Sequence, residues 1–143
     1  MAVSVLDSHL TSTERVQPGQ ANNYENAHGG TVVRLMDELA AVSAMRVAGE
    51  TCVTARISSV EFENPIPVGH VATYSAYVFD TGDTSLQVRV TVESGDPRTT
   101  DTQRTTSACF VMVAVNEDGD PVSVPNIAPE TDRGRRLLED APC

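Results

Sequence analysis

The sequence predicts an α+β fold in which one long helix packs against a curved antiparallel β-sheet. Apolar residues recur at helical spacing in a single long segment, and period-two alternation of apolar and polar residues dominates the segments after it. A helix and a sheet that each have one apolar face bury those faces against each other. The 143 residues suffice for one domain. We therefore expect a single domain over residues 1–143, with its core at about residues 8–126 and a tail at 127–143.

The N-terminal part is expected to hold one strand and the helix. Residues 1–7 show no regular pattern, residues 8–17 could form a first strand, and a polar, turn-rich stretch follows. The helix is predicted from Thr31 to Ala48, with Gly49 as its stop. Its apolar positions recur at spacings near 3.6 and comprise Val32, Leu35, Met36, Leu39, Val42 and Val47.

Four further strands are predicted from alternating patterns, at residues 52–64, 70–80, 84–94 and 104–115. Pro65 and Pro67 close the first of them, because proline cannot donate to a β-ladder. The last strand is apolar on both faces, which favours an interior position in the sheet. Small side chains along the helix should let the sheet wrap closely around it; they are Ala40, Ala41, Ser43, Ala44 and Ala48.

The charge composition excludes several classes of partner. Twenty acidic residues face ten basic ones, every basic residue is arginine, and the net charge is −10. Such a charge repels nucleic acid and anionic membranes. No segment reaches the length of a membrane span, and residues 1–12 lack the pattern of a signal peptide, so we expect a cytoplasmic protein. An acidic excess without lysine resembles proteins of salt-loving organisms, whose concentrated salt screens self-repulsion.

The three cysteines are Cys52, Cys109 and Cys143; they form no CxxC pair, and we expect free thiols. Cysteine and histidine show no spacing typical of metal ligands, so we expect no metal and no cofactor other than a coenzyme carried by the substrate. Cys109 is a weak candidate nucleophile, since it lies in an apolar strand with no histidine nearby in the sequence.

Asp37 is the candidate catalytic residue that the helical pattern singles out. It borders the apolar side of the helix among small neighbours, whereas Glu38 can pair with Arg34 one turn earlier on a solvated face. The alternative interpretation is that Asp37 is only a boundary residue at the edge of the wet face. The pattern alone leaves both interpretations open.

His28, Gly29 and Gly30 precede this helix. The first N–H groups of a helix have no partner within it and carry partial positive charge, and glycine lets a ligand approach them closely. This arrangement suits a phosphate, a carboxylate or a developing oxyanion. The sequence lacks the GxxxxGK[ST] motif of nucleotide-binding loops. A glycine turn that only shapes the helix entry is the alternative.

Four stretches, in the same order as in the family, resemble the hotdog-fold acyl-CoA thioesterases. They are NAHGGTVVRLMDELA from residue 26, VTARISSVEFENPIPVGH from residue 53, TGDTSLQVRVTV from residue 81 and TTSACFVMVAVNEDGDPVSVP from residue 105. The resemblance covers roughly residues 15–126 and implies the hotdog fold, a long central helix wrapped by a curved antiparallel β-sheet. It implies hydrolysis of acyl-CoA thioesters to free acid and coenzyme A.

The resemblance also implies roles for individual residues. Asp37 matches the family's general base or nucleophile, and Asn26 matches an asparagine that positions water or the carbonyl group. Backbone N–H groups of Gly29 and Gly30 would polarise the thioester carbonyl. Contacts to coenzyme A are expected at Arg56, Asn64 and Ser85. The sequence departs from the family pattern at Asn64, where a basic residue is common, and at His70, where an aspartate is usual.

The family resemblance further implies a homodimer with two shared active sites, each using Asn26 of one chain and Asp37 of the other, and further association into a hexamer built as a trimer of dimers. Two other functions remain open alternatives. One is a non-catalytic acyl-CoA sensor, which would need neither Asn26 nor Asp37. The other is an enoyl-CoA hydratase, for which His28 and His70 do not provide the histidine–aspartate pair. Because coenzyme A is polyanionic and the chain is acidic, arginines would have to supply a local binding patch, and the candidates are Arg56, Arg89, Arg104, Arg133, Arg135 and Arg136. For the last three, a short solvated helix is the preferred interpretation.

Overall fold

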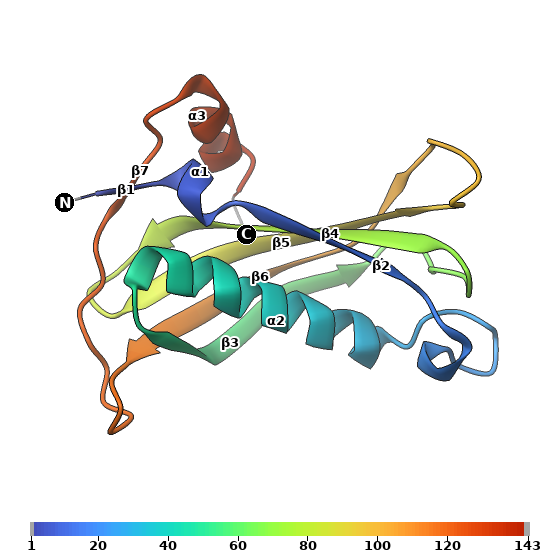
Figure 1. The fold of residues 1–143 in the computed structure, drawn as a ribbon, viewed down its shortest axis with the longest axis horizontal. Coiled ribbons are helices and arrows are strands. Elements are labelled where there is room, and N and C mark those ends of the chain that lie inside the picture. The colour runs from blue at the N-terminus through green and yellow to red at the C-terminus, as the bar shows by residue number, and fades with distance from the viewer. Residues whose placement is uncertain (1, 142–143) are drawn as a thin grey trace.

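The computed structural model describes residues 2–141, which form one long helix packed against a five-stranded sheet (Figure 1). The helix and the strands confirm the predicted α+β order of strand, long helix and four strands. Their bounds are Leu10–Arg15 (β2), Gly29–Ala48 (α2), Thr51–Phe62 (β3), Val71–Thr81 (β4), Ser85–Gly95 (β5) and Gln103–Val115 (β6).

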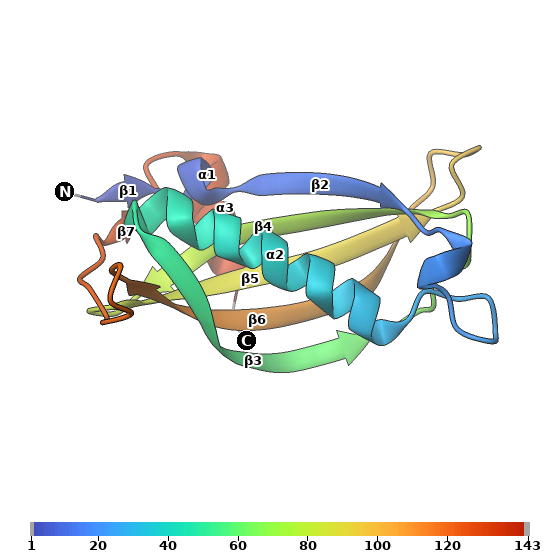
Figure 2. The same cartoon turned by 60° about the horizontal axis from the view of Figure 1, so that its bottom comes forward.

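The five-stranded sheet is antiparallel throughout, with the strand order β2-β4-β5-β6-β3. The strand β6 lies between β5 and β3, which confirms the interior position expected from its apolar faces. The strands β2 and β3 are the two edges. Figure 2 shows the sheet curving around α2, so that the helix lies in the concave side of the sheet.

The core lies between α2 and the concave face of the sheet. Alternation along β5 and β6 points every second residue at the helix, and these residues are fully or almost fully buried: Leu86, Val88, Val90, Val92, Ala108, Phe110, Met112 and Ala114. Ala40, Ser43 and Ala44 on α2 have no exposed surface. The prediction that small residues allow close wrapping is therefore confirmed for these three positions.

The helix α2 begins two residues earlier than the sequence predicts, at Gly29 instead of Thr31. Glycine disfavours a helix interior, but first-turn N–H groups lack partners within the helix in any case, so the packing of Val32 and later residues can extend the helix backward at little cost. At the other end Gly49 adopts a left-handed conformation with φ of 68°, as predicted for a helix stop.

The expectation that residues 1–7 lack structure is wrong for the part that the structure describes. Val3–Ser4 (β1) pairs in parallel with Ile127–Ala128 (β7), and Val5–Ser8 (α1) follows directly. Val5 is fully buried in a small cluster with Tyr77 and Ala141. Elements of two and four residues carry no periodic signal, and only this tertiary packing orders them.

The C-terminal tail contains the short helix predicted from its arginines, Asp132–Glu139 (α3). The side chain of Thr131 caps it by accepting a hydrogen bond from the N–H of Gly134 at 2.9 Å. Arg135 pairs with Asp132 at 3.0 Å on an exposed face. A further one-turn helix, Pro18–Gln20 (η1), lies in the polar stretch before α2.

The cysteines differ in their chemistry. Cys52 is a buried free thiol, as predicted, and burial together with the charge of Glu50 raises its pKa to about 11. Cys109 is disulfide-bonded, so the prediction of a free thiol is wrong there, and a disulfide-bonded sulfur is no nucleophile. Sequence spacing could not show this, because disulfide formation depends on distance in space. Cys143 lies outside the described residues.

Candidate functional site

A hollow of about 340 Å³ lies at the N-terminal end of α2, and we call it the helix-end pocket. The loop before α2, the first turn of α2, the end of β3 with the following turn, and one residue of β6 line it. Its lining residues are Asn22, Asn26, Ala27, Gly29, Val32, Phe62, Glu63, Asn64, Pro65, Ile66 and Thr106. Three of the predicted site residues, Asn26, Gly29 and Asn64, therefore line one pocket at the N-terminal end of α2.

The N-terminus of α2 has no side-chain cap. His28 occupies the N-cap position without a side-chain hydrogen bond to the first turn. Gly29 and Gly30 are exposed. A Cβ atom at Gly30 would meet nothing within 4 Å, and one at Gly29 would meet only the ring of Phe62, at 3.4 Å. There is thus free space beside the first turn of α2, whose N–H groups have no partner within the helix, and such a helix end can bind a negatively charged or polarised oxygen.

Asn26 lies in a tight loop that a second asparagine holds together. The Oδ1 atom of Asn22 accepts hydrogen bonds from the backbone N–H groups of Tyr24 at 2.9 Å and Asn26 at 3.2 Å. The backbone N–H of Asn22 in turn donates to the carbonyl oxygen of Asn26 at 2.8 Å. Both asparagines line the helix-end pocket, but the sequence pattern indicates no role for Asn22 beyond a turn, because asparagine in a polar stretch is typical of turns.

Asp37 is half-buried and faces β3 rather than the helix-end pocket. Its Oδ1 atom accepts a hydrogen bond from the Thr54 hydroxyl at 2.5 Å. Asp37 follows Gly29 by eight positions, which is roughly 12 Å along the helix axis. One chain therefore does not bring Asp37 together with Asn26 and the helix N-terminus.

The solvated face of α2 is as predicted. Arg34 and Glu38 form an exposed ion pair at 3.0 Å, one turn apart. This neighbouring carboxylate has an ordinary surface partner, whereas the carboxylate of Asp37 is held by a hydroxyl on another element. Asp37 is thus half-buried and Glu38 is exposed, as the helical pattern indicates.

The three expected coenzyme A contacts lie apart in one chain. Asn64 lines the helix-end pocket and donates from Nδ2 to the carbonyl oxygen of Arg104 at 2.8 Å. Arg56 is exposed in the middle of β3. Ser85 begins β5 and pairs with Val113, toward the end of the sheet remote from the pocket.

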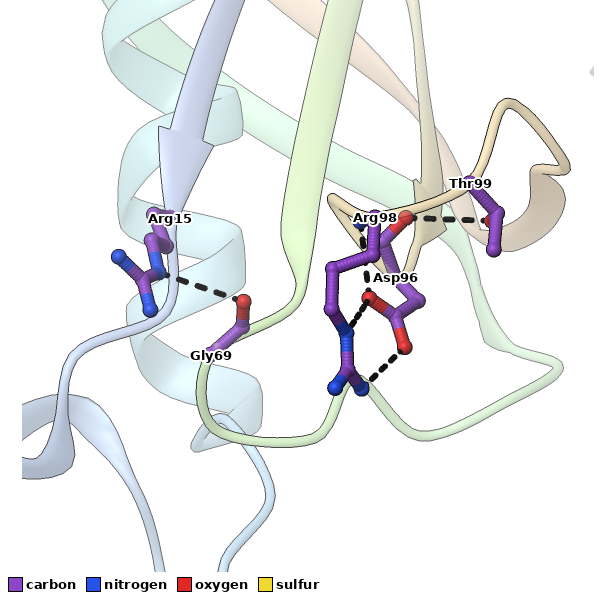
Figure 3. Close-up of polar contacts among 5 residues, drawn as sticks. All are labelled: Arg15, Gly69, Asp96, Arg98 and Thr99. Atoms are coloured by element: carbon purple, nitrogen blue, oxygen red, sulfur yellow. Dashed lines mark hydrogen bonds and ion pairs between the residues drawn. The ribbon is translucent and has the colours of Figure 1, made fainter.

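The loops at the pocket end of the sheet are fixed by local polar contacts (Figure 3). Arg98 bonds Asp96 through both carboxylate oxygens, at 2.9 and 2.7 Å, and hydrogen bonds from Arg98 hold the pKa of Asp96 well below its usual range. Arg15 donates to the carbonyl oxygen of Gly69 at 3.4 Å. His70 lines a separate cleft beside Asp96, not the helix-end pocket.

The outer edge of β3 exposes apolar side chains. Phe62 is 56% exposed, Val53 is 47% exposed, and Ile57 and Val60 are also exposed. A long apolar strand with an unpaired edge is a surface that natural proteins usually cover or pair. Among residues 2–141, no helix is long and apolar enough to cross a membrane, and no cluster of histidine, cysteine and acidic residues could hold a metal ion.

Comparisons with known proteins agree with this geometry. Residues 24–100 match the Thioesterase superfamily. Protein VdlD of Helicobacter pylori is 37% identical over 88% of this chain and 72% of its own length. A hexameric acyl-CoA thioesterase, solved without ligand, superimposes with a TM-score of 0.91 at 37% identity, over 97% of this chain and 89% of that one.

The acyl-CoA hydrolase of Staphylococcus aureus superimposes with a TM-score of 0.90 at 30% identity, over 97% of this chain and 85% of that one. Its structures include a complex with butyryl coenzyme A and variants in which an asparagine, an aspartate and a threonine were each replaced by alanine. In that protein the aspartate follows the asparagine by fifteen positions, and the threonine follows the aspartate by seventeen. Asn22, Asp37 and Thr54 have the same types and the same spacing here.

The fold, the open helix terminus beside a pocket and the match over more than half of the chain agree with one another. The five-stranded sheet wrapped around α2 is the hotdog fold that the sequence motifs imply. This chain belongs to the thioesterase superfamily.

Proposed function

We propose that this chain hydrolyses acyl-CoA thioesters to the free acid and coenzyme A. The observation that carries the proposal is the N-terminus of α2, which has no side-chain cap and whose first residue, Gly29, lines a pocket with both polar and apolar side chains. Such a pocket can accept a thioester carbonyl at the N–H groups and an acyl group beneath it. Two solved relatives of the chain, an acyl-CoA thioesterase at 37% identity and an acyl-CoA hydrolase at 30%, support the proposal.

The active site is shared between two chains in this proposal. In an antiparallel pair of β3 strands, the start of one strand lies opposite the end of the other. Within each chain, Asp37 contacts β3 near its start at Thr54, and the helix-end pocket adjoins its end at Phe62. A two-fold dimer through β3 would therefore carry Asp37 of one chain toward Asn26 and Gly29 of its partner.

The proposed chemistry needs no further group. Asp37 acts as general base on water or as nucleophile at the thioester carbonyl, with the Thr54 hydroxyl orienting its carboxylate. The N–H groups of Gly29 and Gly30 stabilise the negative charge that develops on the carbonyl oxygen. A positioned base contributes about 10²–10⁴-fold and one oxyanion donor about 10²–10³-fold. The coenzyme A thiolate leaves with the electrons of the cleaved C–S bond and takes up the proton that Asp37 removed from water. If Asp37 is the nucleophile, the thiolate takes up a proton from solvent, and water then hydrolyses the anhydride between Asp37 and the acyl group to release the acid and restore the carboxylate.

An asparagine amide at the pocket mouth positions the water or the carbonyl group. The sequence motif points to Asn26, and the spacing of substituted residues in the Staphylococcus aureus relative points to Asn22. Both line the pocket, so both are candidates. Arg56, Asn64 and Ser85 stay proposed contacts to coenzyme A, and the hexamer of the ligand-free relative supports a trimer of dimers.

The first experiment measures thiol release from acyl-CoA substrates by the wild-type protein and by Asp37→Asn. We expect kcat to fall by at least about 10²-fold, because the variant cannot accept a proton or attack the carbonyl. Glu38→Gln is the matched control, since it removes the same charge from the next residue, which pairs with Arg34. Saturable binding of acyl-CoA without any thiol release by the wild type would instead support the sensor.

The second experiment tests the shared site and identifies the asparagine. Asn26→Ala is compared with Asn22→Asp, which keeps the Oδ1 acceptor that closes the loop and removes the amide N–H. The inactive asparagine variant is then co-refolded with Asp37→Asn. Half of the randomly formed dimers are mixed and hold one intact site, so activity returns to roughly one quarter of the wild-type value. Mixtures that stay inactive would show that each chain supplies its own complete site.

A further inference from the structure

We propose that Phe62 and Ile57, two exposed apolar side chains on the concave side of β3, form the wall along which the acyl group of the substrate lies. They would then determine how strongly the enzyme prefers one acyl chain over another. This inference rests on the proposed hydrolysis of acyl-CoA by a dimer, and it assigns specificity residues to that shared site.

The register of the sheet places both side chains on the concave side. Directly paired residues of antiparallel strands project to the same side of a sheet. Ile57 pairs with Phe110, which is fully buried in the core. Phe62 pairs with Thr106, which is buried and lines the helix-end pocket. Ile57 and Phe62 therefore point to the side of the sheet on which α2 lies.

The helix does not cover these two side chains in one chain. Phe62 is 56% exposed and Ile57 is 37% exposed, and only Cys52 is buried along β3. An apolar group of the substrate that lies against them is removed from water together with them, which favours its binding.

The position of Phe62 connects this wall to the proposed chemistry. A Cβ atom at Gly29 would lie 3.4 Å from the Phe62 ring, so the ring adjoins the N–H group that would polarise the carbonyl. Asn22, Asn26 and Asn64 form a polar part of the pocket lining, which suits the amide-rich arm of coenzyme A. The first carbons of the acyl group then lie against the Phe62 ring.

A second chain would continue the wall. In the proposed antiparallel pair of β3 strands, the partner's Thr54 lies opposite Phe62. Ile57 follows Thr54 by three positions, roughly 10 Å along the strand toward the centre of the pair. An extended chain advances about 1.2 Å per bond. The partner's Ile57 would therefore meet the acyl chain at about its eighth carbon, beyond the reach of a butyryl group.

The test compares kcat/KM for straight-chain acyl-CoAs from acetyl to palmitoyl among the wild type, Phe62→Ala and Ile57→Ala. In the wild type, kcat/KM should rise by up to about fourfold for each methylene that becomes buried. Phe62→Ala should lower the ratio of butyryl-CoA to acetyl-CoA turnover by about threefold or more, close to the loss of one buried methylene. Ile57→Ala should leave that ratio unchanged and lower the ratio of lauroyl-CoA to butyryl-CoA turnover by a similar factor.

Val53→Ala is the matched control, because Val53 is 47% exposed on the same strand but pairs with Val113 on the opposite, convex side of the sheet. It removes apolar surface from the same edge and should change neither ratio. Size-exclusion chromatography with light scattering measures the oligomer of every variant. Phe62→Leu keeps an apolar side chain, so it should give an intermediate ratio, and it replaces Phe62→Ala if that variant does not fold.

Unchanged ratios in both wall variants overturn the inference, as do equal changes in Val53→Ala, because the side chains would then only support the dimer. A changed ratio for Phe62→Ala with no change at any chain length for Ile57→Ala overturns the path along β3. Absence of thiol release from every acyl-CoA by the wild type instead overturns the proposed function.

Discussion

A single serine connects the N-terminal segment, the long helix and the sheet. The Oγ atom of Ser8 donates to the carbonyl oxygen of Val5 at 2.6 Å and accepts from the N–H of Val78 at 2.9 Å. The backbone carbonyl oxygen of Ser8 accepts a hydrogen bond from the Ser43 hydroxyl at 2.8 Å. Ser8 and Ser43 are fully buried. These bonds fix the entry of β2 and so the edge of the sheet opposite β3.

We therefore expect Ser8→Ala to lower the free energy of unfolding by about 1–3 kcal/mol, because the N–H of Val78 is left buried without its partner. Urea denaturation at one fixed protein concentration measures this, since oligomer stability depends on concentration. Ser123→Ala, at an exposed position, is the control and should change the free energy of unfolding by less than about 0.5 kcal/mol. Equal effects of the two substitutions would contradict the role of the buried hydroxyl.

At the same residue scale, the sequence predicts Asp37 but not its partner. Helical spacing places Asp37 beside the apolar face, and the structure confirms a half-buried carboxylate. Thr54 is seventeen residues away on β3, and only the packing of helix against strand brings the two together. A role for Asn22 in the site is not predictable from the sequence. Asn22 forms a turn, as its polar surroundings indicate, and this local pattern gives no sign of a second role.

At the scale of elements, periodicity predicts the long helix and the five main strands, and the shortest elements escape it. The strand β5 alternates along most of its length because one face is buried, whereas β4 and β6 also contain runs of consecutive buried residues. The bounds of all three match the prediction within about two residues. The strand β3 also alternates, yet in one chain only Cys52 is buried along it. Its place beside β6 at the edge of the sheet depends on non-local pairing, which no local pattern specifies.

The exposed edge of β3 links the elements to the proposed function. Apolar residues on a solvent-exposed edge are costly in a monomer. Pairing with a second β3 would satisfy the unpaired backbone groups of this edge, and the resulting dimer would complete two active sites at once. The strand β3, whose exposed apolar side chains are unfavourable in a single chain, is therefore the strand through which the proposed dimer forms its shared sites.

At the scale of the whole molecule, charge is the dominant feature. The chain carries a net charge of −10 and has no lysine, and its described ion pairs are three exposed contacts. Such pairs contribute little to stability. Self-repulsion among the remaining acids thus opposes the compact state, and added salt should relieve it, since the Debye length falls from about 10 Å at 0.1 M to about 3 Å at 1 M.

We expect the Tm of the wild-type protein to rise by about 5 °C or more between 0.1 M and 2 M NaCl, as screening stabilises the folded state. The control is a triple variant, Glu117→Gln, Asp118→Asn and Asp120→Asn, in the exposed turn after β6. It removes three negative charges remote from the helix-end pocket, so its Tm at low salt should be higher and its salt dependence smaller. Differential scanning calorimetry at one protein concentration measures both. If wild type and variant show the same salt dependence, salt acts through the hydrophobic effect rather than through charge, and the acidic surface is not an adaptation to concentrated salt.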